Sequence, residues 1–209
     1  MADVIAYIDG FNLYHGLRDR YQHRYLWLDL TKLVRHLRPR DSIVAVRYFT
    51  AVVRNDPPAQ ARQQAYLSAL QAHDGSCLQI VHGRYQAKQQ ACRGCGATWT
   101  SYEEKETDVN IAVSLVADAA ASSTDLALLI SADSDLCPAI RTARTVAAGR
   151  KARFGIAAAF PPKRYSHEIK RLIPGAFTLS HQDIRKSLLP DTVTEATSGR
   201  KFHRPDKWR

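Results

Sequence analysis

The chain contains five short apolar runs, and stretches with helical spacing of apolar residues separate most of them. The run DLALLIS at 125–131 is apolar at nearly every position, which is typical of a strand buried on both faces of a sheet. Strands that alternate with helices favour a parallel sheet with helices on both faces. The sequence therefore predicts an α/β protein, a three-layer α/β/α sandwich with a mostly parallel central sheet. The expected strands are 4–8, 43–49, 77–85, 125–131, 152–160 and a short edge strand at 176–180, and the expected helices are 29–37, 57–74, 108–121, 135–149, 163–174 and 181–188.

One domain is expected to hold most of the 209 residues. This length suffices for one well-buried core, and the sequence has neither an internal repeat nor a second core. We expect the domain at 1–188, with a polar insertion at 86–104 that interrupts the alternation of strands and helices. Residues 189–209 lack periodicity and are expected to form a basic C-terminal tail.

The sequence favours a cytoplasmic location without a membrane partner. The first residues lack the basic and apolar regions of a signal peptide, and no stretch approaches the roughly 18 apolar residues of a membrane helix. Four cysteines in a chain of this length do not make a disulfide framework, which fits a reducing compartment.

The positive charge is concentrated in the last third of the chain. Residues 1–140 carry 14 Lys and Arg against 15 Asp and Glu, a net charge of −1, whereas residues 141–209 carry 16 against 5, a net charge of +11. A solvated basic surface is one interpretation. A polyanionic partner, nucleic acid above all, is the other and the one we favour.

Four acidic side chains stand at or near strand ends. Asp9 follows the first strand, Asp133 and Asp135 follow the run at 125–131, and Asp108 begins the helix before that run. Ligands of parallel α/β sheets gather beyond the carboxyl ends of the strands. If the first strand and the 125–131 strand are neighbours, these carboxylates converge.

Convergent carboxylates repel one another, by about 4 kcal/mol for a pair ~4 Å apart at an effective dielectric constant of ~20. A bound cation relieves this repulsion, and oxygen ligands without His or Cys select Mg²⁺ or Mn²⁺. Such an ion can activate water and stabilise charge on a phosphodiester, and Asn12 could orient the phosphate, the water or a carboxylate. Taken singly, each acid also fits a structural role as a helix cap, a turn residue or a partner of a helix dipole.

Three segments resemble the motifs of NYN domains, the LabA-like branch of the PIN-like nuclease superfamily. They are YIDGFNLYHGL at 7–17, EEKETDVNIAVSLVADA at 103–119 and LLISADSDLCPAIRTA at 128–143, and the resemblance is collinear over about 4–179. It implies a PIN-like sandwich, an acidic pocket for Mg²⁺ or Mn²⁺, and metal-dependent ribonuclease activity. The resemblance assigns metal binding and catalysis to Asp9, Asp108, Asp133 and Asp135. It makes Asn12 their polar catalytic partner and Ser131, the small hydroxyl of the third motif, a candidate for substrate binding. Ala132 replaces the usual Gly and Glu106 replaces a small residue, which puts rate or substrate preference in doubt more than chemistry.

Basic residues near the expected pocket are candidates for binding RNA phosphates. Lys163 and Arg164 follow the 152–160 strand at the edge where the acids are expected, so we regard them as the substrate clamp. Arg150 and Lys151 are further candidates. His15 is interpreted as a structural or surface group rather than an acid–base catalyst.

Cys92 and Cys95 form a Cys-x-x-Cys pair in the polar insertion, which is half of a zinc site. His82, Cys77 or a second subunit would have to complete it. The alternative is an insertion hairpin with metal-free thiols.

Three functions therefore compete. The first is a metal-dependent endoribonuclease acting on single-stranded or structured RNA. The second is a catalytically weak or inactive NYN-fold regulatory module that holds RNA or a protein partner without cleaving. A homodimer or a regulatory protein partner is possible for the chain. The third is a phosphatase of the haloacid dehalogenase type, suggested by the Asp-x-Asp at 133–135. The last is disfavoured because Leu136 stands where that class has Thr or Val.

Overall fold

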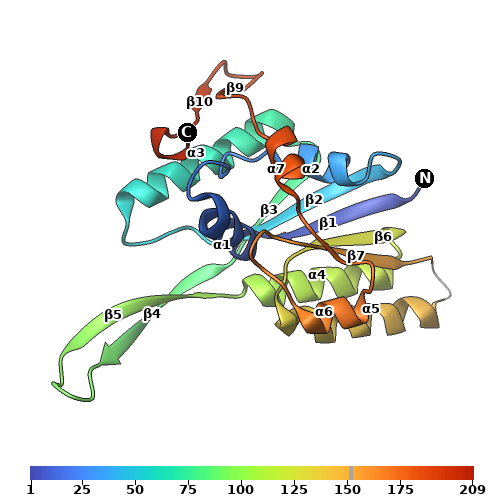
Figure 1. The fold of residues 1–209 in the computed structure, drawn as a ribbon, viewed down its shortest axis with the longest axis horizontal. Helices are drawn as coiled ribbons and strands as arrows, with labels where there is room; N and C mark the ends of the chain where they lie inside the picture. The colour runs from blue at the N-terminus through green and yellow to red at the C-terminus, as the bar shows by residue number, and fades with distance from the viewer. Residues whose placement is uncertain (151–152) are drawn as a thin grey trace.

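The computed structural model of the chain describes residues 1–150 and 153–209, with residues 101–104 described by their backbone alone. A six-stranded sheet forms its centre (Figure 1). The strands are β1 (Asp3–Asp9), β2 (Ser42–Thr50), β3 (Leu78–His82), β6 (Leu126–Ile130), β7 (Gly155–Phe160) and β8 (Phe177–Thr178), in the order β3-β2-β1-β6-β7-β8. All neighbouring strands of this sheet are parallel, which confirms the predicted fold class.

Helices cover both faces of the sheet (Figure 1). One face packs against α1 (Gly10–Tyr21), α2 (Leu30–Leu37), α3 (Pro57–Asp74) and α7 (His181–Lys186). The other packs against α4 (Thr107–Ala121), α5 (Cys137–Gly149) and α6 (His167–Leu172). The short 3₁₀ helix η1 (Ser134–Leu136) links β6 to α5.

Strand β1 shows how the sequence builds two cores from one sheet. Successive side chains of a strand point to opposite faces. Ile8 accordingly belongs to the core under α1 to α3, and Tyr7 belongs to the core under α4 to α6. Both positions are buried, and β1 carries no charged side chain between Asp3 at its start and Asp9 at its end.

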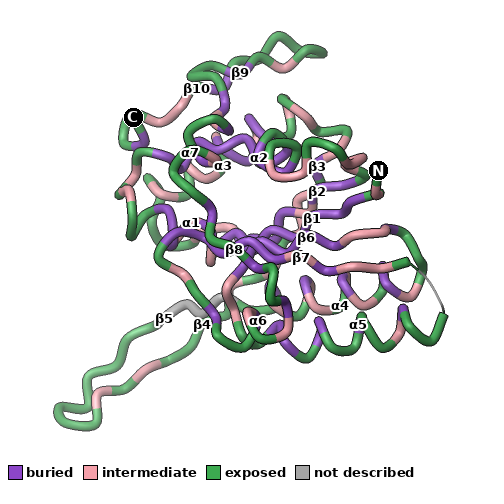
Figure 2. Tube along the Cα trace, turned by 45° about the vertical axis from the view of Figure 1, so that its right-hand side comes forward, coloured by how far each residue is buried: buried purple, intermediate pink, exposed green. Residues whose placement is uncertain are grey.

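The polar insertion folds as a two-stranded antiparallel hairpin of β4 (Arg84–Ala91) and β5 (Thr98–Lys105). The third strand of the sheet consequently ends at His82, three residues before the predicted end at 85. Most of the described hairpin residues are exposed, and the hairpin extends away from the body of the molecule (Figures 1 and 2). Its polar residues could not line a buried strand, which explains the departure from the sheet.

The C-terminal segment packs against the domain. It forms a small hairpin of β9 (Thr192–Thr194) and β10 (Lys201–His203) on α3, followed by η2 (Asp206–Trp208). Trp208 is 6% exposed, and its ring lies near those of Trp27 and Tyr66. A segment without sequence periodicity is therefore anchored by single aromatic side chains. None of the described helices combines the length and apolar character that crossing a membrane requires.

Candidate metal centre

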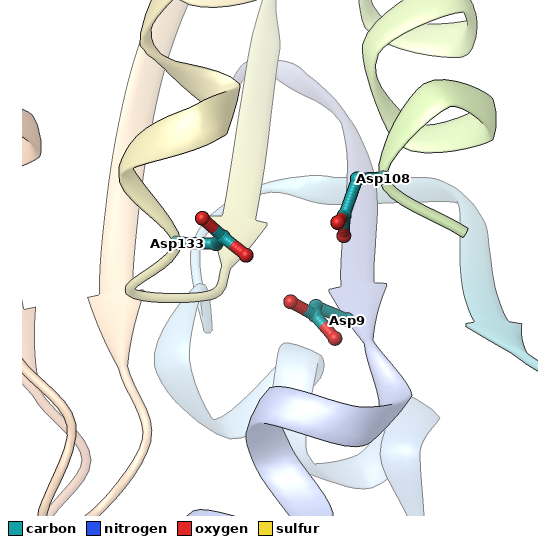
Figure 3. A group of neighbouring side chains, drawn as sticks. All are labelled: Asp9, Asp108 and Asp133. Carbon is teal, nitrogen blue, oxygen red and sulfur yellow. The ribbon is translucent and has the colours of Figure 1, made fainter. Parts of the chain in front are cut away.

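Three of the predicted acids meet at the carboxyl edge of the sheet. Asp9 ends β1, Asp133 follows β6, and Asp108 lies in the first turn of α4. One carboxylate oxygen from each lies within 4.8 Å of the other two (Figure 3). They converge because β1 pairs with β6, and the predicted convergence of the acids depended on this pairing.

Asp135, the fourth predicted ligand, is not part of this group. It is exposed on η1, and its backbone N–H donates a hydrogen bond of 2.9 Å to Oδ1 of Asp133. Its side chain lines a separate hollow with Arg141 and Arg171. The second acid of the Asp-x-Asp pair thus lies in the 3₁₀ helix that follows Asp133 and outside the group of three acids.

Asp9 is held in place by hydrogen bonds to both of its oxygens. Oδ1 accepts from the backbone N–H of Asn12 at 2.9 Å, so the carboxylate caps α1, and Oδ2 accepts from the Ser131 hydroxyl at 2.8 Å. The Ser131 hydroxyl also accepts from the backbone N–H of Asp133 at 3.0 Å. Ser131 has 0% exposure, so it offers no surface to a substrate and instead couples two of the acids.

Asn12 joins the two loops that carry the acids. Its side-chain oxygen accepts a hydrogen bond of 3.0 Å from the backbone N–H of Ala132, in the loop after β6. Gly10 makes the preceding turn possible, because a Cβ at this position would lie 2.5 Å from the backbone oxygen of Phe49. Each named residue of the Asp-Gly-x-Asn sequence thus has a structural role. The Asp is the buried acid, the Gly allows the close backbone approach, and the Asn side chain fixes the opposite loop.

The electrostatics of the buried Asp9 carboxylate favour a cation beside it. The pKa of Asp9 is raised from 3.8 to about 6, chiefly by burial. The hydrogen bonds from Asn12 and Ser131 lower this pKa, and the neighbouring Asp133 charge raises it. A carboxylate that is only 3% exposed carries a large desolvation cost when it is charged. A divalent cation beside it would remove that cost.

The acids open into a hollow of about 340 Å³ that is also lined by Phe11, Asn12, His15 and Arg164. His15 was not predicted as a site residue. Burial, together with the charges of Arg18 and Arg164, lowers its pKa, so the imidazole is neutral at pH 7. Phe11 and His15 lie four residues apart within the first motif, and this helical spacing places them on one face of α1. The spacing was the sequence signal that could have identified His15 as a site residue.

The predicted basic residues divide by position. Arg164 lines the acidic hollow and pairs with Asp19, and the adjacent Lys163 is exposed with a left-handed φ of 59°. Arg150 follows the far end of α5, whose 13 residues span roughly 20 Å from the end nearest the acids. α5 runs from the edge of the sheet that carries the acids back to the opposite edge, where the next parallel strand begins. Arg150 therefore lies at that opposite edge and not at the hollow. Lys151 lies outside the described residues.

A second hollow of about 300 Å³ adjoins the acidic one and shares Phe11 and His15 with it. Its walls are mainly aromatic and aliphatic, and Trp208 of the C-terminal segment contributes to them. The aromatic lining residues are Phe11, Tyr14, Tyr48, Tyr66, Tyr85 and Trp208. This second hollow can therefore accept an aromatic ring of a ligand next to the hollow that the three carboxylates line.

The donor set suits a small divalent cation. Mg²⁺ binds oxygen at about 2.0–2.1 Å, so oxygens on opposite sides of the ion are about 4.2 Å apart. Three carboxylate oxygens within 4.8 Å of one another need only a small inward movement to reach such an ion. Asp9, Asp108 and Asp133 therefore fit Mg²⁺ or Mn²⁺ by chemistry and by spacing.

An α/β/α sandwich with acidic side chains gathered beyond a parallel sheet defines the PIN-like class of fold. The NYN domain family, a branch of that superfamily, matches residues 3–168, and the chain belongs to this family. NYN domains have a nuclease-type fold. The matched range covers every acid of the candidate site.

Two further similarities place the chain among characterised proteins and solved structures. It is 27% identical over 175 residues to 6-hydroxy-3-succinoylpyridine 3-monooxygenase of Pseudomonas putida, a match that covers 66% of this chain and 54% of that enzyme. The chain thus spans about half the length of this curated relative. A protein of unknown function from Vibrio parahaemolyticus is similar in structure with a TM-score of 0.54 and 16% identity, over 90% of this chain and 96% of that one, which supports the fold.

Proposed function

We propose that the protein is a metal-dependent ribonuclease that hydrolyses RNA phosphodiester bonds. The observation that carries this proposal is the meeting of Asp9, Asp108 and Asp133 at the carboxyl edge of an NYN-type sheet. Three carboxylates gathered at one place repel one another, and an NYN fold that only bound RNA would have no need of such a cluster. The repulsion is consistent with a catalytic use of the cluster.

Each side chain has a distinct part in this proposal. Asp9, Asp108 and Asp133 hold the ion, and Ser131 and Asn12 fix the positions of the acids through the hydrogen bonds described above. An ion of Mg²⁺ or Mn²⁺ held there would supply the positive charge that activates water and stabilises the phosphodiester as charge develops on it. Asp135 is assigned an outer role, since it supports Asp133 through its backbone.

RNA is the proposed substrate because of the charges around the hollow. Arg164 lines it and Lys163 follows the strand next to it, where both can contact phosphates. The net charge of +11 over residues 141–209 provides the wider attractive field. Single strands or unpaired loops fit best, because the aromatic hollow beside the acids can stack an unpaired base.

The test is cleavage of end-labelled RNA with Mg²⁺, with Mn²⁺ and with EDTA. We expect cleavage with either metal and none with EDTA, and products with 5′-phosphate and 3′-hydroxyl ends because water is the proposed nucleophile. Asp9→Asn should lower the rate at least about 100-fold, whereas Asp206→Asn, a change at an exposed acid on the C-terminal segment, should leave it unchanged.

The same assay separates the competing functions. A module that only binds RNA would retain RNA without cutting it under any metal condition. A phosphatase of the haloacid dehalogenase type would release p-nitrophenol from p-nitrophenyl phosphate and leave RNA intact. Either result would reject the ribonuclease proposal.

A second candidate function rests on the aromatic hollow and the Pseudomonas putida relative, whose name assigns it action on a substituted pyridine. A volume of about 300 Å³ with mostly apolar walls is at the lower end for small-molecule sites. This candidate predicts saturable binding of 6-hydroxy-3-succinoylpyridine by calorimetry, lost in Tyr48→Ala. Absence of binding at millimolar concentration would reject it.

A further inference from the structure

The tip of the β4–β5 hairpin is a turn built around two thiols. Cys92 follows β4, and its backbone N–H donates to the oxygen of Ala97 at 2.8 Å, while the N–H of Gly96 donates to the oxygen of Cys92 at 2.9 Å. Gly96 has a φ of +72°, which favours glycine. The backbone N–H groups of Cys95 and Gly94, followed by the Cys95 side chain, lower the pKa of the Cys92 thiol by hydrogen bonding to it. The turn therefore holds the two thiols side by side at the tip, which is the arrangement of half a tetrahedral zinc site.

The two thiols are an incomplete metal site within one chain. Among the described residues, no third Cys, His, Asp or Glu joins Cys92 and Cys95 in a group of potential ligands. The residues whose side chains lie outside that description, 101–104 and 151–152, include neither Cys nor His. Their two acids, Glu103 and Glu104, pair with Gln86 and Tyr85 at the base of the hairpin, far from its tip. A structural zinc site needs four ligands.

The fold rules out the two completions within the chain that the sequence offered. His82 ends β3 in the central sheet, and the eight residues of β4 place the tip roughly 26 Å further on at about 3.3 Å per residue. Cys77 lies beyond the opposite end of β3, where its thiol contacts the backbone oxygen of Ile43 at 3.7 Å. The missing ligands must therefore come from another molecule.

Two observations favour a second copy of the same chain. Trp99 lies opposite Gln90, one pair from the end of the hairpin, and is 52% exposed although Trp27 and Trp208 are buried. An exposed tryptophan of this kind is typical of a contact surface. Four thiolates around Zn²⁺ carry a net charge of −2, and two copies bring two Arg93 side chains at the tips to balance it.

We propose that one zinc ion joins two copies of the chain tip to tip, bound by Cys92 and Cys95 of each. The hairpin holds its tip away from the body of the molecule (Figure 1), so two tips can meet without the bodies of the two copies having to overlap. An isolated two-stranded hairpin is marginally stable in water, and the shared ion would also stabilise it. This dimer is independent of the ribonuclease proposal, since no residue of the acidic site takes part.

The test is a Co²⁺ titration of the full chain, reduced and freed of metal, with absorption and molar mass measured together. We expect saturation at one ion per two chains, the charge-transfer absorption of a four-thiolate tetrahedral site, and a doubling of mass over the same range. Zn²⁺ should displace the cobalt while the dimer persists. Acrylamide quenching of Trp99 should fall on dimerisation.

Matched variants identify the ligands. Cys92→Ser and Cys95→Ser should each abolish the absorption and the dimer with unchanged thermal unfolding of the domain, because the tip lies outside both cores. Cys77→Ser should preserve both signals. One ion per chain on a monomer, no uptake of cobalt, a dimer that persists in Cys92→Ser, or unchanged quenching of Trp99 would each overturn the proposal.

Discussion

At the scale of single residues, the buried Asp9 carboxylate is the group on which the site depends. It links β1, α1 and the loop after β6 through its two oxygens, and burial holds its pKa at about 6. A carboxyl pKa raised by folding means that the folded state loses stability as the pH rises from about 4 to about 6. Without metal, the charged Asp9 is therefore a cost at neutral pH.

This cost predicts the effect of Asp9→Asn on the metal-free protein. At pH 8 the variant should be more stable than the wild type, by up to about 3 kcal/mol for a pKa difference of about 2 units. The difference should shrink as the pH falls to 4, where Asp9 is protonated in the folded state and partly protonated in the unfolded state. Thermal unfolding in EDTA across this pH range measures it, and a variant that is equally destabilised at pH 4 and pH 8 would contradict the assignment.

Ser131→Ala should shift the pH dependence of cleavage. The hydroxyl lowers the pKa of Asp9, so its loss should raise that pKa and move the acid limb of the pH–rate profile to higher pH. The backbone N–H of Asp133 also loses its acceptor, at a cost of about 1–3 kcal/mol in stability. Ser134→Ala, at the neighbouring exposed hydroxyl, serves as control, and an identical profile in both variants would reject the coupling role.

At the scale of elements, the turn from β1 into α1 sets the position of the site. Much of this scale could be predicted from sequence, since the apolar run of β1 and the spacing of the later helices specify the sheet and the edge where the acids gather. The position of Asp135 outside the group of three acids could not be predicted, because a 3₁₀ turn and an α-helical start look alike in sequence. The position of Arg150 was missed because the length of α5 decides which edge it reaches.

Gly10→Ala tests the turn directly. The added Cβ would lie 2.5 Å from a backbone oxygen of β2, which cannot move without breaking the sheet. We expect a loss of about 2–4 kcal/mol in the free energy of unfolding, measured by urea denaturation. Gly149→Ala, where nothing lies within 4 Å, should cost less than about 1 kcal/mol. Equal losses in the two variants would show that the close approach is absent.

At the scale of the whole molecule, the separation of charges orients the protein toward a polyanion. The basic excess was evident from sequence, but its distribution between the two edges of the sheet depends on topology: Lys163 stands at the edge with the acids and Arg150 at the other. The partner of Trp208, Trp27, could not be predicted, because single aromatic anchors leave no periodic pattern.

The variants Lys163→Gln and Arg150→Gln, one at each edge of the sheet, compare the contribution of the two edges to RNA binding. We expect Lys163→Gln to weaken RNA binding and to lower the slope of log affinity against log salt by about 1, as the loss of one phosphate contact requires. Arg150→Gln should change neither quantity by a comparable amount. Fluorescence anisotropy with labelled RNA in Ca²⁺ at several salt concentrations measures both, and equal effects would show that RNA does not approach the acidic edge.

The most direct measurement on the acidic site is an anomalous difference map from crystals soaked in Mn²⁺. We predict one strong peak within coordination distance of Asp9, Asp108 and Asp133, lost in crystals of Asp9→Asn. A map without a peak there at saturating Mn²⁺, or a peak bound by Asp135 in place of Asp108, would contradict the proposed metal centre and the ribonuclease chemistry that depends on it.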